Sequence, residues 1–335
     1  MIGRDTSLPL FIHKETLSCL DKGCIACLYK LSPSGKLGNL TFPPNVRPEL
    51  CPRSTLNLSR TIESGIYWQT SGESILTCGD GDFTFSLSLS NDASFKTRTE
   101  ETGFCMTATS HETRESVLKT YGDPTDRTLR ILEENGAKVI HGVDATDLES
   151  VIELREKKFD KIIWNFPCVG QGLSAGADGQ SSEMEENKQL IMNFFRSASN
   201  FLNTNGEIHI AHKTIEPFCW WNIHKLGQDS GIGFDCVGSL IFDRMLFPGY
   251  VNRKALHKKS FPCHDAQIYV FKRVHAATLP DQAPSRSLSW ALSECETLDE
   301  GTLARIVEKV KRALQIAQLE SKKKQAGKKR KWASK

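Results

Sequence analysis

Seven short apolar runs alternate with segments of helical period between residues 74 and 273, and this alternation is the main structural signal of the chain. Helical segments are expected at residues 83–89, 112–121, 128–135 and 190–202. Strands separated by helices predict an α/β fold with a doubly wound, mostly parallel sheet of seven strands, in which the last strand is antiparallel. The expected strands are residues 75–78, 104–108, 138–142, 159–164, 207–211, 236–242 and 267–272.

The segments on either side of this pattern differ from it in character. Residues 1–70 lack a clear period and are interpreted as an irregular N-terminal extension, so the sheet domain is assigned to residues 71–275. A polar linker with prolines follows at 276–300. Residues 301–320 have apolar positions on one helical face and predict an amphipathic helix that docks on the sheet domain or on a partner. Its apolar positions are Leu303, Ile306, Val307, Val310 and Leu314.

The basic character of the chain is concentrated in its last fifteen residues. The formal net charge is +3, but residues 321–335 hold eight lysines and arginines and no acidic residue, so the rest of the chain is net negative. We expect this tail to be disordered and to act as a nuclear or nucleolar address or as an RNA-contacting arm. A solvated tail that only aids solubility, in a cytoplasmic protein, is the alternative.

The composition limits the class of protein. No run of eighteen apolar residues is present, so no membrane span is expected, and residues 1–14 show no signal peptide. Eleven scattered cysteines, among them Cys78, Cys105 and Cys236 in strand-like runs, indicate free thiols in an intracellular protein. Cys24 and Cys27, with Cys19 or Cys51, have zinc-like spacing, but a second CxxC pair is missing and we predict no metal.

The turn after the first predicted strand carries the most informative chemistry. Gly79, Asp80, Gly81, Asp82 and Phe83 stand where doubly wound folds bind nucleotides. A dinucleotide fingerprint would place a small residue where Thr84 stands, and two carboxylates would repel a pyrophosphate. The turn suits a cationic ligand such as S-adenosylmethionine, which has a sulfonium and an ammonium group. An acidic surface turn is the alternative.

Polar residues also follow the next two predicted strands. Glu112 is positioned to accept hydrogen bonds from ribose hydroxyls, and Asp144, with Ala145 beside it, to accept one from an adenine amino group. Each acid on its own is equally typical of a helix cap. At successive strand ends, they predict one cofactor-binding edge.

The fourth predicted strand ends in Asn165, Phe166 and Pro167, and the fifth is followed by Lys213. An amide with stiff backbone carbonyls can orient a planar N–H toward a methyl donor, and an ammonium can stabilise negative charge on a base. We assign these four residues as candidate catalytic residues, and we assign Asn165 to cofactor binding as well. A turn that merely ends the strand is the alternative.

A basic and aromatic segment connects the last two predicted strands. Between residues 243 and 265, five lysines and arginines alternate with aromatic side chains, an arrangement suited to RNA phosphates and to a stacked base. The alternative is a turn packed on the core with solvated charges. The predicted substrate-binding residues are Phe247, Tyr250, Arg253 and Lys254.

Seven of these segments together resemble the eukaryotic large-subunit (25S-type) rRNA uridine-N3-methyltransferase-like family, whose members are Rossmann-like class I methyltransferases. The resemblance covers roughly residues 72–273 and rests on residues 75–86, 108–110, 142–146, 165–167, 206–209, 221–223 and 247–250. Cys168 stands where the family pattern usually has histidine.

The resemblance implies an S-adenosylmethionine-dependent methyltransferase that acts on N3 of a uridine in pre-ribosomal large-subunit RNA. We expect it to work as a monomer in the nucleus or nucleolus. Three alternatives stay open: an RNA-binding or ribosome-assembly protein without activity, a methyltransferase with another acceptor, and a dinucleotide-dependent oxidoreductase.

Overall fold

The structure is a computed structural model of the whole chain. It describes residues 8–22, 24, 73–91, 106–169, 181–254, 257–261, 263, 266–273, 295–299 and part of 301–319. Cys27, Cys51, Cys105 and the basic tail therefore lie outside the described residues.

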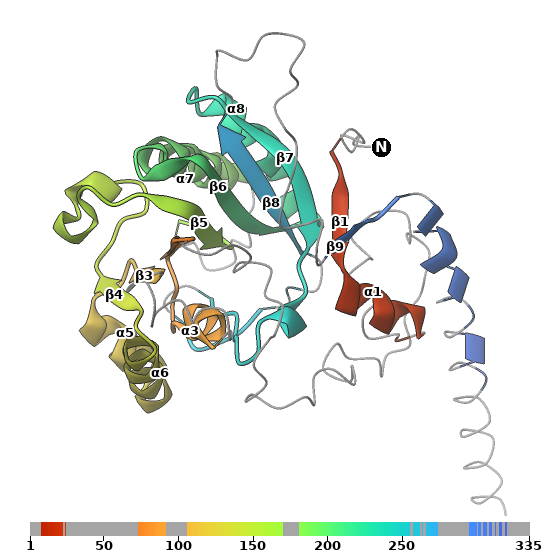
Figure 1. Cartoon of the computed structure of the whole chain (residues 1–335), viewed down its shortest axis with the longest axis horizontal. Coiled ribbons are helices and arrows are strands. Elements are labelled where there is room, and N and C mark those ends of the chain that lie inside the picture. The colour runs from red at the N-terminus through yellow and green to blue at the C-terminus, as the bar shows by residue number, and fades with distance from the viewer. Residues whose placement is uncertain are drawn as a thin grey trace, which may run out of the picture.

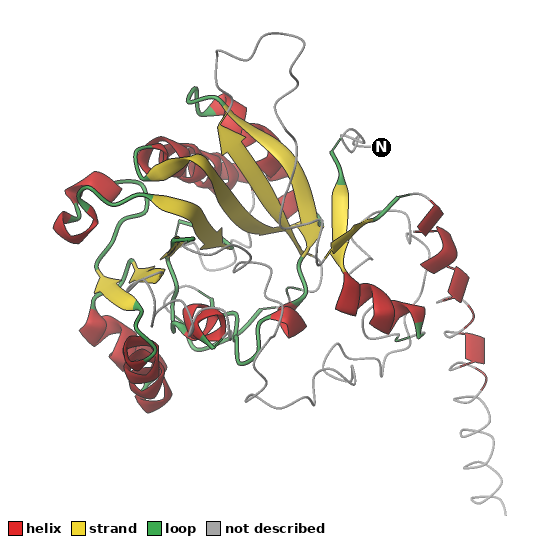
Figure 2. Ribbon diagram, in the orientation of Figure 1, coloured by secondary structure: helices red, strands yellow, loops and turns green. Residues whose placement is uncertain are grey.

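One nine-stranded sheet runs through the molecule in the order β4-β3-β2-β5-β6-β8-β7-β1-β9 (Figures 1 and 2). β4, β3, β2, β5 and β6 are parallel to one another, whereas β8 is antiparallel to both β6 and β7. The strands are β1 (Leu10–His13), β2 (Ile75–Cys78), β3 (Met106–Ser110), β4 (Lys138–His141), β5 (Phe159–Asn165), β6 (Leu202–Lys213), β7 (Phe234–Ile241), β8 (Ala266–Arg273) and β9 (Cys295–Thr297).

The path of the chain creates a switch point between β2 and β5. From β2 the chain adds β3 and β4 on one side, then returns to place β5 and β6 on the other side. Neighbouring connections leave in opposite directions there, so a crevice opens at the carboxyl ends of these strands. The predicted α/β fold with a mostly parallel, doubly wound sheet is confirmed, including an antiparallel strand, β8, at the end of the domain.

Helices cover both faces of the sheet (Figure 1). α3, α5 and α6 bury apolar side chains against the face that includes Ile163, and α7 and α8 pack on the opposite face, which includes Ile162. Successive residues of β5 thus face opposite cores, as pleated geometry requires. The helices are α1 (Lys14–Asp21), α3 (Thr84–Ser90), α5 (Arg114–Tyr121), α6 (Asp123–Glu134), α7 (Ser181–Ser199) and α8 (Ile223–Asp229), with short 3₁₀ turns η4 (Leu148–Ser150), η5 (Ile152–Leu154), η6 (Phe218–Trp221) and η7 (Arg244–Leu246).

Two strands come from segments in which no regular structure was expected, so the sheet has nine strands and not seven. β1 and α1 lie within the predicted irregular extension, and β9 lies within the predicted linker. β1 runs parallel to β7 and antiparallel to β9. Its four residues are too few for a periodic signal, and Phe11, Ile12 and His13 are all buried, so polar and apolar positions do not alternate.

Two further features concern the ends of the chain. Within residues 301–319 the described residues are helical; Ile306 is buried, and the ammonium of Lys309 lies 2.7 Å from a carboxylate oxygen of Asp21 in α1. The amphipathic segment therefore docks next to α1. In the described part of the chain, no helix is both long enough and apolar enough to cross a bilayer.

Candidate active site at the carboxyl ends of the sheet

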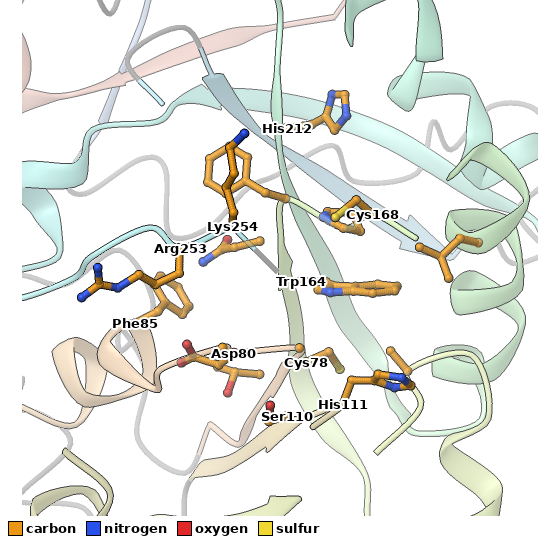
Figure 3. Close-up of a pocket in the computed structure, with 18 of the residues that line it drawn as sticks. Cys78, Asp80, Phe85, Ser110, His111, Trp164, Cys168, His212, Arg253 and Lys254 are labelled. Carbon is orange, nitrogen blue, oxygen red and sulfur yellow. The ribbon is translucent and has the colours of Figure 1, made fainter. Parts of the chain in front are cut away.

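A single cavity of about 980 Å³ lies at the carboxyl ends of β2, β3, β5 and β6. In Figure 3, Asp80, Ser110 and His111 occupy one end of the view and His212 the other, with Trp164 between them. Most of the predicted site residues line it: Gly79, Asp80, Gly81, Asp82, Glu112, Asp144, Ala145, Asn165, Phe166, Pro167, Lys213, Tyr250, Arg253 and Lys254.

Phe83 and Phe247 do not line the cavity, which corrects two predicted contacts. Phe83 is fully buried and packs edge-on against His141, with ring centroids 5.2 Å apart. Phe247 is 3% exposed and packs on Phe85 and Phe242, at 5.1 and 5.7 Å. Both rings stabilise the core that supports the site, because burying an aromatic side chain contributes more than leaving it in solvent.

The two glycines of the turn lie close to aromatic side chains. Gly79 has φ +61°, and a Cβ placed there would lie 2.6 Å from Nε1 of Trp164. A Cβ at Gly81 would lie 2.9 Å from the Tyr121 hydroxyl. Any side chain at Gly79 would meet both a strained backbone and the indole, so the turn keeps its shape only with glycine.

Asp80 is the most perturbed carboxylate of the turn. One of its oxygens accepts hydrogen bonds from the Ser86 amide at 2.8 Å and from the Ser86 hydroxyl at 2.7 Å. Burial, and after it the nearby charge of Asp82, raise the pKa of Asp80 from 3.8 to about 7. Within the described residues Asp80 has no ion-pair partner, so a cationic ligand would favour its charged form.

Asp82 is already paired with a cation of the protein. Its Oδ2 lies 2.8 Å from Nε of Arg253, and its Oδ1 accepts the hydroxyl proton of Thr84 at 2.6 Å. The Val251 amide donates to the same Thr84 hydroxyl at 3.0 Å. Asp82 and Arg253, predicted to bind cofactor and substrate respectively, therefore bind each other and join the glycine turn to the segment after η7.

Glu112 and Asp144 stand at the ends of β3 and β4 as predicted, with local partners. Glu112 accepts hydrogen bonds from the Ser116 hydroxyl at 2.9 Å and the Tyr121 hydroxyl at 3.3 Å. Exposed Asp144 accepts from the amide and hydroxyl of Thr146, at 2.8 and 2.7 Å. Each carboxylate retains lone pairs for a further donor, since an ionised carboxylate accepts about four hydrogen bonds.

The Asn165–Phe166 turn combines unsatisfied polar atoms with a strained backbone. Both Oδ1 and Nδ2 of Asn165 are buried without a hydrogen-bond partner in the described part of the chain. Phe166 has φ +53°, a conformation that is uncommon for a bulky residue, and its ring packs edge-on against Phe242 and Phe261. Unpaired buried groups and strain of this kind concentrate at functional sites.

The far end of the cavity holds the predicted Lys213 together with His212 and Trp221, to which sequence reasoning assigned no role. The ammonium of Lys213 lies 4.8 Å from the ring centroid of Phe218 and 5.7 Å from that of Phe261. Nδ1 of His212 donates to the Lys213 carbonyl at 2.9 Å, and burial lowers the pKa of His212 to about 4. Trp221 completes this wall, with its ring 4.5 Å from that of His212.

His212 and Lys213 end β6, and Trp221 ends the η6 turn after it. This position at a strand end is the one signal by which His212 and Trp221 were predictable. The 221–223 segment stood out as a motif without a role. Cys168 also lines the cavity, is exposed and is a free thiol. In the described part of the chain, no group of acidic, histidine and cysteine side chains is arranged to hold a metal ion.

The chain matches a protein-family model over residues 76–254, more than half of its length. The family is BMT5-like, described as rRNA (uridine-N3-)-methyltransferase BTM5-like. The match begins in β2, includes the glycine turn and the Asn165 turn, and ends at Lys254.

Relatives and solved structures with similarity to the chain are of several kinds. In Arabidopsis thaliana, "Heavy metal-associated isoprenylated plant protein 41" is 34% identical over 55% of this chain and 33% of its own length, so the chain spans a third of that relative. "Uncharacterized protein At4g26485" of the same plant is 30% identical over 62% of this chain and 97% of its own length. The crystal structure of an rRNA methylase from Streptococcus thermophilus aligns with a TM-score of 0.34 at 11% identity, covering 63% of this chain and 93% of that one.

Proposed function

This chain belongs to the BMT5-like family, and from that membership we propose that it is an S-adenosylmethionine-dependent RNA methyltransferase that modifies N3 of a uridine in large-subunit rRNA. One observation carries the proposal beyond the family: a single cavity brings together the acidic glycine turn, Gly79–Asp82, and the Asn165–Pro167 turn. The first has the chemistry for a cationic cofactor, and the second has an amide without partners.

The residues at the β2 end fit S-adenosylmethionine. Gly79 has no room for a side chain beside Trp164, and with no side chain at Gly79 or Gly81 the backbone of the turn can approach a ligand. Asp80 has a pKa of about 7, so the positive charge of the cofactor would favour its ionised form. Glu112 and Asp144 can accept hydrogen bonds from the ribose and the adenine. Asp82 is not proposed to contact the cofactor, because its charge is paired with that of Arg253. The ion pair holds the glycine turn in place.

The residues at the β5 and β6 ends suit a planar acceptor. S-adenosylmethionine, when bound, supplies an electrophilic methyl group on its sulfonium. The amide of Asn165 holds the edge of the base, and the strained Phe166 turn with Pro167 fixes the direction of that amide. Loss of the N3 proton to water leaves negative charge on N3 and on the two carbonyl oxygens of the base, which the ammonium of Lys213 stabilises. Alignment of the two reactants contributes most of the rate, so a strong base is not needed.

The segment after η7 is proposed to hold the RNA strand. Lys254, Lys258 and Lys259 are exposed and available for phosphates. Tyr250 lines the cavity and packs edge-on against Phe85, 5.3 Å away, so its ring forms a fixed wall. Together with the basic run of residues 322–331, these cations support pre-ribosomal RNA as partner and the nucleolus as location. We also propose that the protein acts as a monomer.

Two measurements test the proposed function. Calorimetry with the full chain should detect binding of S-adenosylmethionine and S-adenosylhomocysteine, and no firm binding of NAD or ATP. Nucleoside mass spectrometry of large-subunit rRNA should then find less 3-methyluridine in cells that lack the protein. Firm binding of NAD in place of S-adenosylmethionine would contradict the cofactor assignment. Cofactor binding with unchanged 3-methyluridine would leave another acceptor, whereas absence of both would favour a binding protein without activity.

A further inference from the structure

Trp221 has a buried hydrogen-bond donor that the fold leaves unused. Its side chain is 2% exposed, and its indole Nε1 has no hydrogen-bond partner in the described part of the chain. A buried N–H without a partner loses its hydrogen bonds to water and gains none in return, so native structures rarely keep one. Trp221 lines the cavity, which is where a ligand can provide the missing acceptor.

The position of the indole ring is well determined by its neighbours. Trp221 ends η6 and belongs to the core between the sheet and α7 and α8. Its ring packs against His212 at 4.5 Å and Phe218 at 6.1 Å, and the His212 ring is held by its bond to the Lys213 carbonyl. In the free protein the indole ring is therefore packed in the wall of the cavity, with Nε1 covered.

Two other groups at this end of the cavity offer hydrogen-bond donors. Lys213 contributes an ammonium, and Asn165 contributes an amide N–H₂ that has no partner in the described residues. Burial lowers the pKa of His212 to about 4, so its ring is neutral near pH 7. The positive charge beside it is that of Lys213. A ligand with two carbonyl oxygens on a flat ring matches this set of donors.

We propose that the indole N–H of Trp221 donates a hydrogen bond to a ring carbonyl oxygen of the acceptor base and thereby selects uracil. Uracil has two ring carbonyl oxygens flanking N3, whereas cytosine replaces one of them with an amino group that has no acceptor to offer. The same bond gains strength as negative charge develops on those oxygens during methyl transfer. Because Nε1 is covered in the free protein, this bond requires the indole ring to turn toward the cavity when the base binds, a kind of side-chain change that is common on ligand binding.

This inference rests on the proposed function, and a matched pair of variants tests it. Trp221→Phe removes the N–H and keeps a flat ring, whereas Trp220→Phe makes the same change in the neighbouring residue, which is 43% exposed and outside the cavity wall. With large-subunit rRNA from cells lacking the protein as substrate, Trp221→Phe should lower kcat/KM roughly tenfold to a hundredfold. Trp220→Phe should be unchanged, and both variants should bind S-adenosylhomocysteine like the wild type.

Nuclear magnetic resonance of the indole protons gives a readout on the wild-type protein that does not depend on activity. A variant is needed only to assign the signal. In the wild-type protein saturated with S-adenosylhomocysteine, uridine 5′-monophosphate should move one indole N–H signal downfield, and cytidine 5′-monophosphate should move it less. Loss of that signal in Trp221→Phe identifies it. Equal rRNA methylation by the two variants, or a Trp221 signal that uridine 5′-monophosphate does not move, overturns the role of Trp221. Neither result affects the proposed function. A wild-type protein that methylates no RNA overturns the proposed function as well.

Discussion

Asp80 lowers the stability of the folded protein once its carboxyl group ionises. Its folded-state pKa of about 7 lies above the ordinary 3.8, so the unfolded chain ionises first and the folded state loses stability as pH rises from about 4 to 7. Asp80→Asn keeps an oxygen for Ser86 and removes this penalty. We expect its Tm to rise by roughly 3–10 °C at pH 8 and to match the wild type at pH 4, with weaker S-adenosylmethionine binding. Equal Tm values at pH 8 would mean that Asp80 is not strained in the free protein.

Asn165 allows a second test at the same scale, because its amide makes no hydrogen bond within the described residues. Both polar atoms are buried without partners in the described residues, so Asn165→Ala removes a desolvation penalty and should leave the free energy of unfolding equal or higher. Methyl transfer should fall at least about a hundredfold, while cofactor affinity stays near normal. Calorimetry and a filter-binding methylation assay measure the two effects. Loss of cofactor binding would move Asn165 to the cofactor side of the cavity.

Among elements, the contact between the glycine turn and the segment after η7 is the one that joins the two halves of the site. Asp82 is 3% exposed, so Arg253→Ala leaves a buried carboxylate without its cation and should destabilise the protein by about 1–3 kcal/mol, reduced because Arg253 is a third exposed. Asp82→Asn in the same chain should recover part of that loss in urea unfolding. The exposed Arg130–Asp126 pair is the matched control, and Arg130→Ala should change stability by less than about 0.5 kcal/mol. Equal losses of unfolding free energy in the two arginine variants would show that the Asp82–Arg253 pair stabilises the protein no more than an exposed ion pair.

The same scale shows what could be predicted from the sequence. β2 and the Asn165 turn were predictable because an apolar run next to glycine or proline is a local signal. β1 was not, because a four-residue strand buried on both faces has no alternation and forms only when β7 offers it an edge. Phe247 was misassigned because a turn motif does not reveal which face of the ring is covered. Trp221 and the Asp82–Arg253 pair needed the fold, since 171 residues separate Asp82 from Arg253.

For the whole molecule, β1 makes the N-terminal segment part of the sheet. Ile12 is fully buried, between β7 and β9, and Ile12→Ala should destabilise the protein by about 2–4 kcal/mol, the range for a core residue. Thermal or urea unfolding measures this loss, and Ile152→Ala is the control, because Ile152 is 69% exposed. If Ile12→Ala unfolds like Ile152→Ala, β1 contributes no stability to the sheet.

Charge is divided between the parts of the chain, and this division has a consequence for RNA binding. Residues 321–335 hold eight cations and the remainder is net negative, so most of the sequence-independent attraction to RNA is assigned to the tail. Removing residues 321–335 should weaken rRNA binding and make the plot of log affinity against log salt less steep, by about 0.7 for each lost contact to single-stranded RNA. Tm and S-adenosylmethionine affinity should not change, because the cavity residues all precede residue 262. An unaltered slope in filter binding between 50 and 200 mM salt, about the range over which counterion release is large, would instead assign RNA attraction to Lys254, Lys258 and Lys259 around the cavity.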